Sequence, residues 1–367
     1  MFTAVDHRHM ARALQLAARG LYTTDPNPRV GCVLVRDGQI VGEGWHERAG
    51  GPHAEIHALQ QAGSAAAHAT AYVTLEPCCH QGRTPPCTEA LVRAGVRRVI
   101  AAMEDPNPQV AGNGLRALQS AGIEVQAGLL AFQAEQLNQG FVQRMRHGRP
   151  WLRCKLAMSL DGRTALAKGE SRWITGESAR RDVHRLRARS SAILTGIDTV
   201  LADNPALTAR PAGSDPAAVR QPLRVILDSR LRMPADAQLL GLPGETLVIT
   251  TEHAGVARER LFAAGVPVAV LPAREGRLDL AAVMRHLATL QLNEIHVEAG
   301  ATLSGALLLA GLVDELVIYM APHLLGDTAR GLFVLPALER MDTRPGLAIS
   351  DIRAIGRDWR ITARLAG

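Results

Sequence analysis

Residues 53–87 read HAEIHALQQAGSAAAHATAYVTLEPCCHQGRTPPC, and this stretch decides the fold and chemistry of the first half of the chain. His53, Cys78 and Cys87 offer one imidazole and two thiolates, the donors that zinc prefers. Three protein donors leave the fourth tetrahedral position for a water, which is typical of a catalytic zinc site. Zinc lowers the pKa of bound water from roughly 16 to about 7, and Glu55 stands beside the ligands to move protons. The stretch therefore predicts an enzyme.

Two proline-containing turns predict that the ligands lie where helices begin. Pro52 suits the first position of a helix, so we expect Glu55 to lie in its first turn, beside the histidine ligand. Thr84 is a predicted N-cap, with Pro85 at the first position of a helix that contains Cys87. A cysteine there meets the positive end of the helix, which favours the thiolate.

Two neighbouring residues offer other ligand sets. Cys79 would take the place of Cys78 in one alternative. In another, His57 joins His53, one helical turn away, in a closed structural site without catalysis. We favour the open site, because a closed site leaves Glu55 beside the metal without a role.

Length and cysteine content indicate a cytoplasmic protein of two domains. The chain has 367 residues, 47% of them hydrophobic, which is enough for two cores of ordinary size. Three of the five cysteines belong to the zinc motif, so we expect no disulfide framework and a reducing cytoplasm. Cys32 and Cys154 are predicted to be buried in strands. The longest apolar stretch, residues 306–313, is too short to span a bilayer, so we expect no membrane partner.

The positive charge does not indicate a nucleic-acid partner. The formal net charge is +6, but residues 1–147 contain 13 arginines, no lysine and 12 acidic residues, without a long basic run. Aromatic residues make up 3% of the chain, so few stacking platforms are present for single-stranded nucleic acid. The modest surplus of arginine favours a phosphorylated small molecule as the partner.

Alternating helix and strand patterns predict an α/β fold for the first domain. The expected elements are a helix over residues 9–19 and strands over 30–35, 40–44, 71–75 and 99–102. A turn at Asp37-Gly38 indicates a hairpin. The strand over 71–75 runs directly into Cys78, so the metal is expected at the carboxyl end of a sheet, where open α/β folds bind ligands.

A domain boundary is expected near residues 147–150, where an arginine- and glycine-rich segment ends and a new apolar pattern begins. The second half lacks the G-x-G-x-x-G fingerprint of dinucleotide-binding domains. Its pattern predicts a strand over 294–297, a loop of small residues over 297–303 and a helix over 303–310. Such a loop lets backbone amides approach a diphosphate at a helix N-terminus.

The order of the ligands resembles the signature of zinc-dependent nucleobase deaminases, H-x-E followed by P-C and a later cysteine. The longer form E-P-C-x-H-x-G-R-T-P-P-C at residues 76–87, with P-N-P-R-V-G-C-V at residues 26–33, is similar to the pyrimidine deaminases of riboflavin biosynthesis. Residues 155–164, 171–175 and 199–210 resemble the reductase of the same pathway. The chain is identified as a member of the bifunctional deaminase-reductase family of riboflavin biosynthesis.

The resemblance implies an architecture, two cofactors and two reactions. It implies an N-terminal cytidine-deaminase-like three-layer domain over residues 1–147, followed by a C-terminal dihydrofolate-reductase-like α/β domain over residues 148–367. Zn²⁺ would serve the first domain and NADPH the second. The family deaminates a diaminohydroxyphosphoribosylaminopyrimidine to the corresponding uracil and then reduces the ribosyl to the ribityl side chain. It also implies a homo-oligomer, either a dimer or a tetramer.

The resemblance assigns roles to single residues as well. Asn27 would hydrogen-bond the pyrimidine and Arg83 would lie near the ribose phosphate, tasks that suit an amide and a guanidinium. The residues expected to face the reductase substrate are Lys155, Ser171, Arg187, Leu207, Arg210 and Glu298. Those expected to line NADPH are Ala157, Trp173, Thr199, Asp203, Ser229, Gly300, Ala301, Thr302 and Leu303. Core packing is the alternative role for residues such as Trp173 and Leu207.

Two other functions remain open from the residues alone. A zinc deaminase of this kind would act on a nucleic-acid base, as tRNA-type deaminases do, and the second half would be an accessory domain. The other alternative is a structural zinc module joined to a lone reductase.

Overall fold

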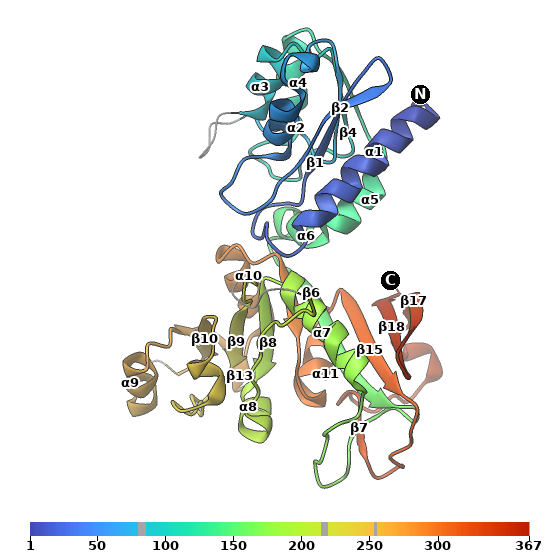
Figure 1. Cartoon of the computed structure of the whole chain (residues 1–367). Helices are drawn as coiled ribbons and strands as arrows, with labels where there is room; N and C mark the ends of the chain where they lie inside the picture. The colour runs from blue at the N-terminus through green and yellow to red at the C-terminus, as the bar shows by residue number, and fades with distance from the viewer. Residues whose placement is uncertain (80–85, 214–218, 253–254, 367) are drawn as a thin grey trace. The chain divides into compact units, whose positions relative to one another are not determined.

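The structure is a computed structural model, and it describes residues 1–79, 86–213, 219–252 and 255–366. The chain divides into two compact units, Met1–Gly148 and Arg149–Gly367, both of mixed helix and strand (Figure 1). Among the helices of these residues, none combines the length and the apolar character that a membrane crossing requires.

The first unit is built on a five-stranded sheet in the order β2-β1-β3-β4-β5. Its strands are β1 (Gly31–Arg36), β2 (Gln39–Trp45), β3 (Thr70–Val73), β4 (Arg98–Ala101) and β5 (Glu124–Ala127). β1 is antiparallel to β2 and β3, whereas β3, β4 and β5 run parallel. Asp37 and Gly38 both have positive φ in the turn between β1 and β2, so the predicted hairpin is confirmed.

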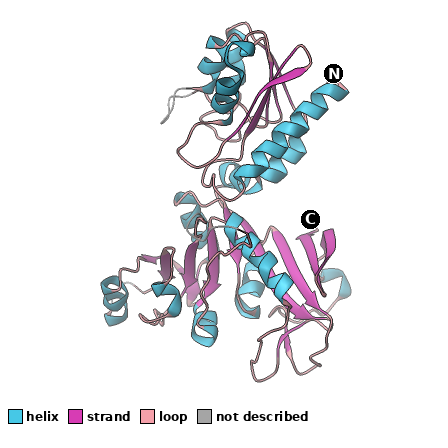
Figure 2. Ribbon diagram, in the orientation of Figure 1, coloured by secondary structure: helices cyan, strands magenta, loops and turns pink. Residues whose placement is uncertain are grey.

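Helices cover both faces of this sheet, as the alternation along β1 shows. Val33 and Val35 lie in a buried cluster with the helix Ala4–Ala17, whereas Cys32 and Leu34 lie in a second cluster with the helix Ala54–Ala62. The helices are α1 (Ala4–Ala17), α2 (Ala54–Ala62), α3 (Cys87–Arg93), α4 (Asn113–Ser120), α5 (Ala131–Leu137) and α6 (Gln139–His147). Figure 2 shows them as cyan ribbons on the two sides of the strands. The first unit is thus a three-layer α/β/α body.

Two helices of this unit differ from the prediction at their first residues. His53 is not helical but is the N-cap of α2, because its carbonyl accepts the first helical hydrogen bonds, from Ile56 and His57. The helix α3 begins at Cys87 itself, with Pro86 as its N-cap. The predicted cap Thr84 and the predicted first position Pro85 lie outside the described residues.

Other elements were predicted with shifted ends or not at all. The helix predicted from residue 9 begins at Ala4, because Thr3 and Asp6 form a capping box there. The strand β5 and the helices α4 to α6 were not predicted. Cys32 in β1 and Cys154 in the strand β6 (Trp151–Ser159) are fully buried, so the prediction for both is confirmed.

The second unit is built on a nine-stranded sheet in the order β11-β10-β9-β8-β14-β6-β15-β18-β17. These strands are β6 (Trp151–Ser159), β8 (Ala192–Gly196), β9 (Leu223–Leu227), β10 (Thr246–Thr250), β11 (Val268–Val270), β14 (Glu294–Val297), β15 (Glu315–Ala321), β17 (Leu347–Ile355) and β18 (Asp358–Leu365). The seven strands from β11 to β15 in this order run parallel, and β18 and β17 add an antiparallel hairpin. Two short ladders pair β7 (Arg163–Ala165) with β16 (Arg330–Gly331) and β12 (Ala273–Arg274) with β13 (Arg277–Leu278).

The two faces of this second sheet differ in polarity. Ile295 and Val297 of β14 lie in the largest apolar cluster, with side chains of the helices Leu280–Thr289 and Ala301–Leu309. The alternate residue Glu294 lies on the opposite face, where it pairs with Arg189 of the helix Glu177–Arg189. The helices are α7 (Glu177–Arg189), α8 (Ile197–Asp203), α9 (Val256–Ala263), α10 (Leu280–Thr289) and α11 (Ala301–Leu309). The predicted strand over 294–297 is confirmed as β14, and the helix expected from residue 303 begins at Ala301.

Candidate active sites

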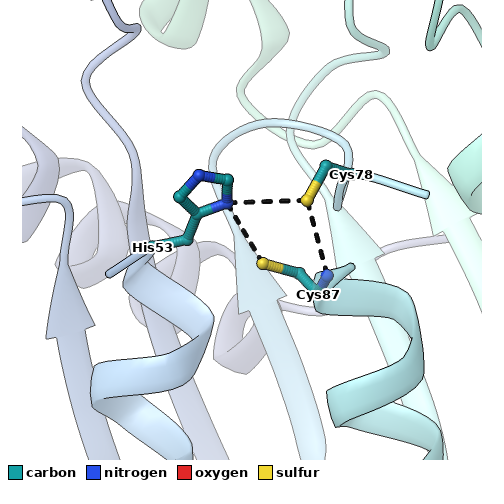
Figure 3. A group of neighbouring side chains, drawn as sticks. All are labelled: His53, Cys78 and Cys87. Carbon is teal, nitrogen blue, oxygen red and sulfur yellow. Dashed lines mark hydrogen bonds between the residues drawn. The ribbon is translucent and has the colours of Figure 1, made fainter. Parts of the chain in front are cut away.

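Three elements of the first unit bring the predicted zinc ligands together. His53 precedes α2, Cys78 follows β3, and Cys87 opens α3. One donor atom from each residue lies within 4.8 Å of the other two. His53 Nδ1 is 3.2 Å from Cys87 Sγ and 3.5 Å from Cys78 Sγ, and Figure 3 shows the three side chains turned toward one another.

These distances fit one small tetrahedral cation. Zn–N bonds of about 2.0 Å and Zn–S bonds of about 2.3 Å place donor atoms about 3.5 Å apart around zinc. Within the described part of the chain, the cluster contains neither Cys79 nor His57, the two residues of the alternative ligand sets. The donor chemistry and the spacing therefore fit zinc with three protein ligands.

The pKa values of the two cysteine ligands are shifted in opposite directions. The hydrogen bond from Cys87 and the nearby His53 lower the pKa of Cys78 to about 4, although burial opposes this shift. The hydrogen bond to Cys78, together with burial, raises the pKa of Cys87. The protein without a cation therefore carries one thiolate here at neutral pH, and a divalent cation has to displace the second proton.

Glu55 lies in the first turn of α2 and is only 3% exposed. Burial raises its pKa to about 7, while the attraction of His53 opposes the shift. Its Oε2 atom is buried without a hydrogen-bond partner in the described structure. A carboxyl group with this pKa both accepts and releases a proton near neutral pH, as general acid-base chemistry requires.

Asn27 is held by a histidine that the sequence reasoning missed. Asn27 Nδ2 lies 3.1 Å from Nε2 of His46, and His46 Nδ1 lies 3.0 Å from the carbonyl oxygen of Pro52. Because that carbonyl only accepts, Nδ1 carries the proton and Nε2 accepts from the Asn27 amide. Burial and the neighbouring His53 lower the pKa of His46, which keeps the ring neutral. The one sequence signal was a polar residue directly after β2 and close to the zinc motif.

Tight packing places α2 against β2 next to this histidine. A Cβ atom added to Gly44 would lie 2.2 Å from the carbonyl oxygen of Ala54, so only glycine fits at this strand position. Because of this close approach, the first turn of α2, which contains Glu55, lies next to the end of β2, which His46 directly follows. Arg83, the predicted phosphate contact, lies outside the described residues.

In the second unit the predicted substrate residues Arg187 and Glu298 form a pair. Arg187 donates to Glu298 Oε1 at 2.5 Å and to Oε2 at 2.8 Å, and it also donates to the carbonyl of Thr208 at 2.9 Å. Burial raises the pKa of Glu298, but Arg187 outweighs it and holds that pKa well below its usual range. Burial lowers the pKa of Lys155, which Glu298 opposes. The structure therefore places Lys155 near a carboxylate that Arg187 already neutralises.

The other predicted substrate residues have varied surroundings. Arg210 is exposed, and its backbone N–H donates to His184 Nδ1 at 3.2 Å. Ser171 is half-buried. Leu207 is 3% exposed and packs in an apolar cluster with Ile193 and Ile226, as its core-packing alternative describes.

The residues predicted to line NADPH gather at the carboxyl ends of neighbouring parallel strands. Ala157 lies near the end of β6, Thr199 lies in α8 after β8, and Ser229 follows β9. Gly300 is the N-cap of α11, and Ala301, Thr302 and Leu303 form its first turn after β14. These strands are adjacent in the sheet, so their carboxyl ends share one edge, where open α/β folds bind ligands.

Two predicted cofactor residues are joined by an arginine. Trp173 is 68% exposed, which excludes core packing, and the guanidinium groups of Arg180 and Arg172 lie 4.6 Å and 5.8 Å from its ring centroid. Arg172 also donates to the carbonyl of Asp203 at 2.5 Å. The segment with Trp173 is thus tied to the end of α8.

Comparison with known proteins gives each half of the chain a family. Residues 3–103 match the cytidine and deoxycytidylate deaminase zinc-binding region. Residues 150–361 match the RibD C-terminal domain.

Relatives extend the similarity to nearly the whole chain. The riboflavin biosynthesis protein RibD of Escherichia coli K12 is 55% identical over 361 residues, which cover 96% of this chain and 97% of the relative. The solved structure of Acinetobacter baumannii RibD, form 1, has a TM-score of 0.93 and 46% identity, with 99% of each chain covered. A Thermotoga maritima diaminohydroxyphosphoribosylaminopyrimidine deaminase/5-amino-6-(5-phosphoribosylamino)uracil reductase has a TM-score of 0.87 and 31% identity, again over 99% of each chain.

These matches confirm the predicted pair of folds, a cytidine-deaminase-like domain followed by a dihydrofolate-reductase-like α/β domain. They do not favour a deaminase of nucleic-acid bases with an accessory domain. The chain belongs to the RibD family of riboflavin biosynthesis proteins and is a bifunctional enzyme that combines a deaminase with a reductase.

Proposed function

We propose that residues 1–147 deaminate diaminohydroxyphosphoribosylaminopyrimidine to the corresponding uracil, and that residues 148–367 then reduce its ribosyl group with NADPH. The convergence of His53, Cys78 and Cys87 beside the buried carboxyl group of Glu55, whose Oε2 atom has no hydrogen-bond partner in the described structure, is the observation that carries the proposal. We assign Zn²⁺ to these three ligands. When bound, zinc supplies a Lewis acid that makes water acidic enough to react at neutral pH.

The proposed chemical role of Glu55 is proton transfer. The side chain receives a proton from the attacking water and delivers it to the amino group that leaves as ammonia. The raised pKa of about 7 suits both steps, because a stronger acid would not hold the proton and a weaker acid would not release it. Burial of Glu55 keeps bulk water from competing for that proton.

We assign the recognition of the pyrimidine to Asn27. Its Nδ2 end is bound to His46, so its Oδ1 end is left to accept from an N–H group of the ring. His46 thereby sets which edge of the amide meets the substrate. Arg83 is proposed to bind the ribose phosphate.

In the second unit we place NADPH along the carboxyl edge of the sheet. The first turn of α11, residues 301–303, offers backbone N–H groups and a positive helix end to the diphosphate. When bound, NADPH supplies the hydride. Lys155, Arg187 and Glu298 hold the sugar and Arg210, which is exposed, binds the phosphate.

We propose that the protein works as a cytoplasmic homo-oligomer, a dimer or a tetramer. The edge strand β17 supports the assembly, since Leu347, Ile349 and Ile352 are 47%, 57% and 54% exposed on it. An apolar edge strand of nine residues is a ready surface for another copy. The cysteines that the structure describes are free thiols, which suits a reducing compartment. Sedimentation velocity tests the oligomer, and a purely monomeric protein would contradict it.

The two activities are separable by substitution. Glu55→Gln removes the group that moves protons while leaving the three ligands, so deamination should fall by about 10²- to 10⁴-fold with zinc still bound. The exposed Glu104→Gln is the matched control and should keep full activity. NADPH-dependent reduction of the deaminated intermediate should be unchanged in both variants. Deamination at the normal rate by Glu55→Gln would exclude the proposed role of Glu55.

A further inference from the structure

The carboxylate of Glu76 makes four hydrogen bonds that the proposed reaction does not use. Glu76 follows β3, lies two residues before Cys78 and is only 3% exposed. Its Oε1 atom accepts from the backbone N–H groups of Gly114 at 2.8 Å and Leu115 at 3.2 Å. Each carboxylate oxygen has two acceptor positions, so this oxygen is fully engaged.

The second oxygen binds the same stretch of chain. Glu76 Oε2 accepts from the backbone N–H groups of Asp105 at 3.0 Å and Gly112 at 2.9 Å. The four donors belong to the segment 105–115, which ends in the first turn of α4. One buried side chain therefore binds the turn after β3 to this segment at four points.

The backbone of the same turn also packs directly against α4. A Cβ atom added to Gly114 would lie 2.0 Å from the carbonyl oxygen of Pro77, so only glycine allows this contact. The ring of Pro77 fixes its own φ, which leaves few free torsions between the Glu76 side chain and Cys78.

A separate pair of contacts holds Cys78 from the other side. Its carbonyl oxygen accepts from the backbone N–H of Thr88 at 3.2 Å and from the Thr88 hydroxyl at 3.3 Å. Thr88 belongs to α3, the helix that begins with Cys87. The turn with Cys78 is thus held between α3 and the segment 105–115.

We propose that Glu76 is a positioning residue of the deaminase site, whose buried carboxylate fixes the turn that presents Cys78 to the metal. The inference rests on the proposed role of Cys78 as a zinc ligand. Glu76 itself touches neither metal nor substrate in this account; it acts through the backbone of Pro77. A ligand held in advance at its bonding position releases the metal more slowly, and loss of such support commonly costs 10- to 100-fold in metal affinity.

Glu76→Gln tests the proposal, because glutamine keeps one acceptor oxygen and turns an NH₂ group toward two backbone donors. The full-length protein is loaded with Zn²⁺ and mixed with an excess of chelator, well below its unfolding temperature. We expect zinc release about tenfold faster or more in Glu76→Gln, with a normal rate of NADPH-dependent reduction of the deaminated intermediate. Glu104→Gln, an exposed carboxylate directly before the segment 105–115, is the matched control and should release zinc at the wild-type rate.

A second variant reaches the same turn without changing Glu76. In Gly114→Ala the added methyl group displaces the Pro77 carbonyl, so zinc release should again be faster. This variant decides the test if Glu76→Gln does not fold. Visible spectra of the Co²⁺-substituted proteins should change in both variants, because the Cys78 thiolate is displaced. Wild-type release rates and spectra in the folded variants would overturn the proposal and leave Glu76 a purely structural role. Failure of the wild-type protein to bind zinc would instead overturn the ligand assignment on which the proposal rests.

Discussion

The Nε2 atom of His46 lies 3.1 Å from the Nδ2 atom of Asn27, and this contact fixes the orientation of the Asn27 amide. The orientation follows from a chain of hydrogen bonds. The Pro52 carbonyl requires a proton on Nδ1 of His46, and Nε2 then requires a donor. Since burial lowers the pKa of His46 and keeps its ring neutral, this series of hydrogen bonds has one arrangement near neutral pH.

His46→Phe should therefore weaken substrate recognition more than chemistry. Phenylalanine keeps the ring shape but accepts nothing from Asn27, so the amide loses its fixed orientation. A hydrogen bond of this kind contributes about 1 kcal/mol, so we expect the deaminase KM to rise about fivefold with a smaller change in kcat. Steady-state ammonia release measures both constants. The control is His147→Phe on an exposed residue of α6, and an unchanged KM in His46→Phe would argue against the orienting role.

Zinc removal should abolish one activity and spare the other. Dialysis against a chelator is expected to stop ammonia release, while NADPH oxidation with the deaminated intermediate continues. Loss of both activities would mean that the metal also supports the second unit.

The affinity of the site for zinc should rise with pH. The pKa of Cys87 is raised in the metal-free protein, so binding at neutral pH has to release its proton. Each proton released makes the affinity about tenfold stronger per pH unit in that range. Competition with a chromophoric chelator at several pH values gives the slope, and a flat profile would contradict the acidities described for the two cysteines.

The second unit should lose stability in mild acid because of His184. Burial, together with Arg187 and Arg210, lowers the pKa of this histidine from 6.5 to about 4. The folded state therefore binds fewer protons than the unfolded state between these values, so the stability contribution is complete above about pH 6.5 and declines as the pH falls toward 4. His184→Gln should flatten this part of the profile. Urea unfolding followed by tryptophan fluorescence measures it, and an equally steep decline in the variant would assign the effect to other groups.

Much of the first site was predictable because its chemistry is local in the sequence. His53 and Glu55 are two residues apart, and the cysteines follow short segments with prolines, so ligand types and spacing were visible without tertiary structure. His46 and Glu76 were missed because their roles come from partners far along the chain. Glu76 binds residues 105–115, and no local pattern shows that a glutamate before Pro77 meets those amides.

The same distinction holds for the folds. The hairpin at Asp37-Gly38 was predictable because a positive φ at both residues is a property of that dipeptide. The strand β5 was not, because none of its four residues is buried, so it lacks the apolar pattern of β3 and β4; its pairing with β4 is what orders it. In the second unit, β14 carries the polar residues Glu294 and His296 on the charged face of the sheet, where Glu294 pairs with Arg189 of α7 and His296 lies near Glu298. A buried parallel strand is usually apolar throughout.

The most direct test of the account follows ammonia release and NADPH oxidation together when the zinc-loaded protein meets diaminohydroxyphosphoribosylaminopyrimidine. The account predicts that both signals appear and that ammonia precedes NADPH oxidation, because the uracil product of the first site is the substrate of the second. NADPH oxidation before any ammonia, or without it, would contradict the proposed order of the two reactions. Ammonia without NADPH oxidation would contradict the assignment of the second unit.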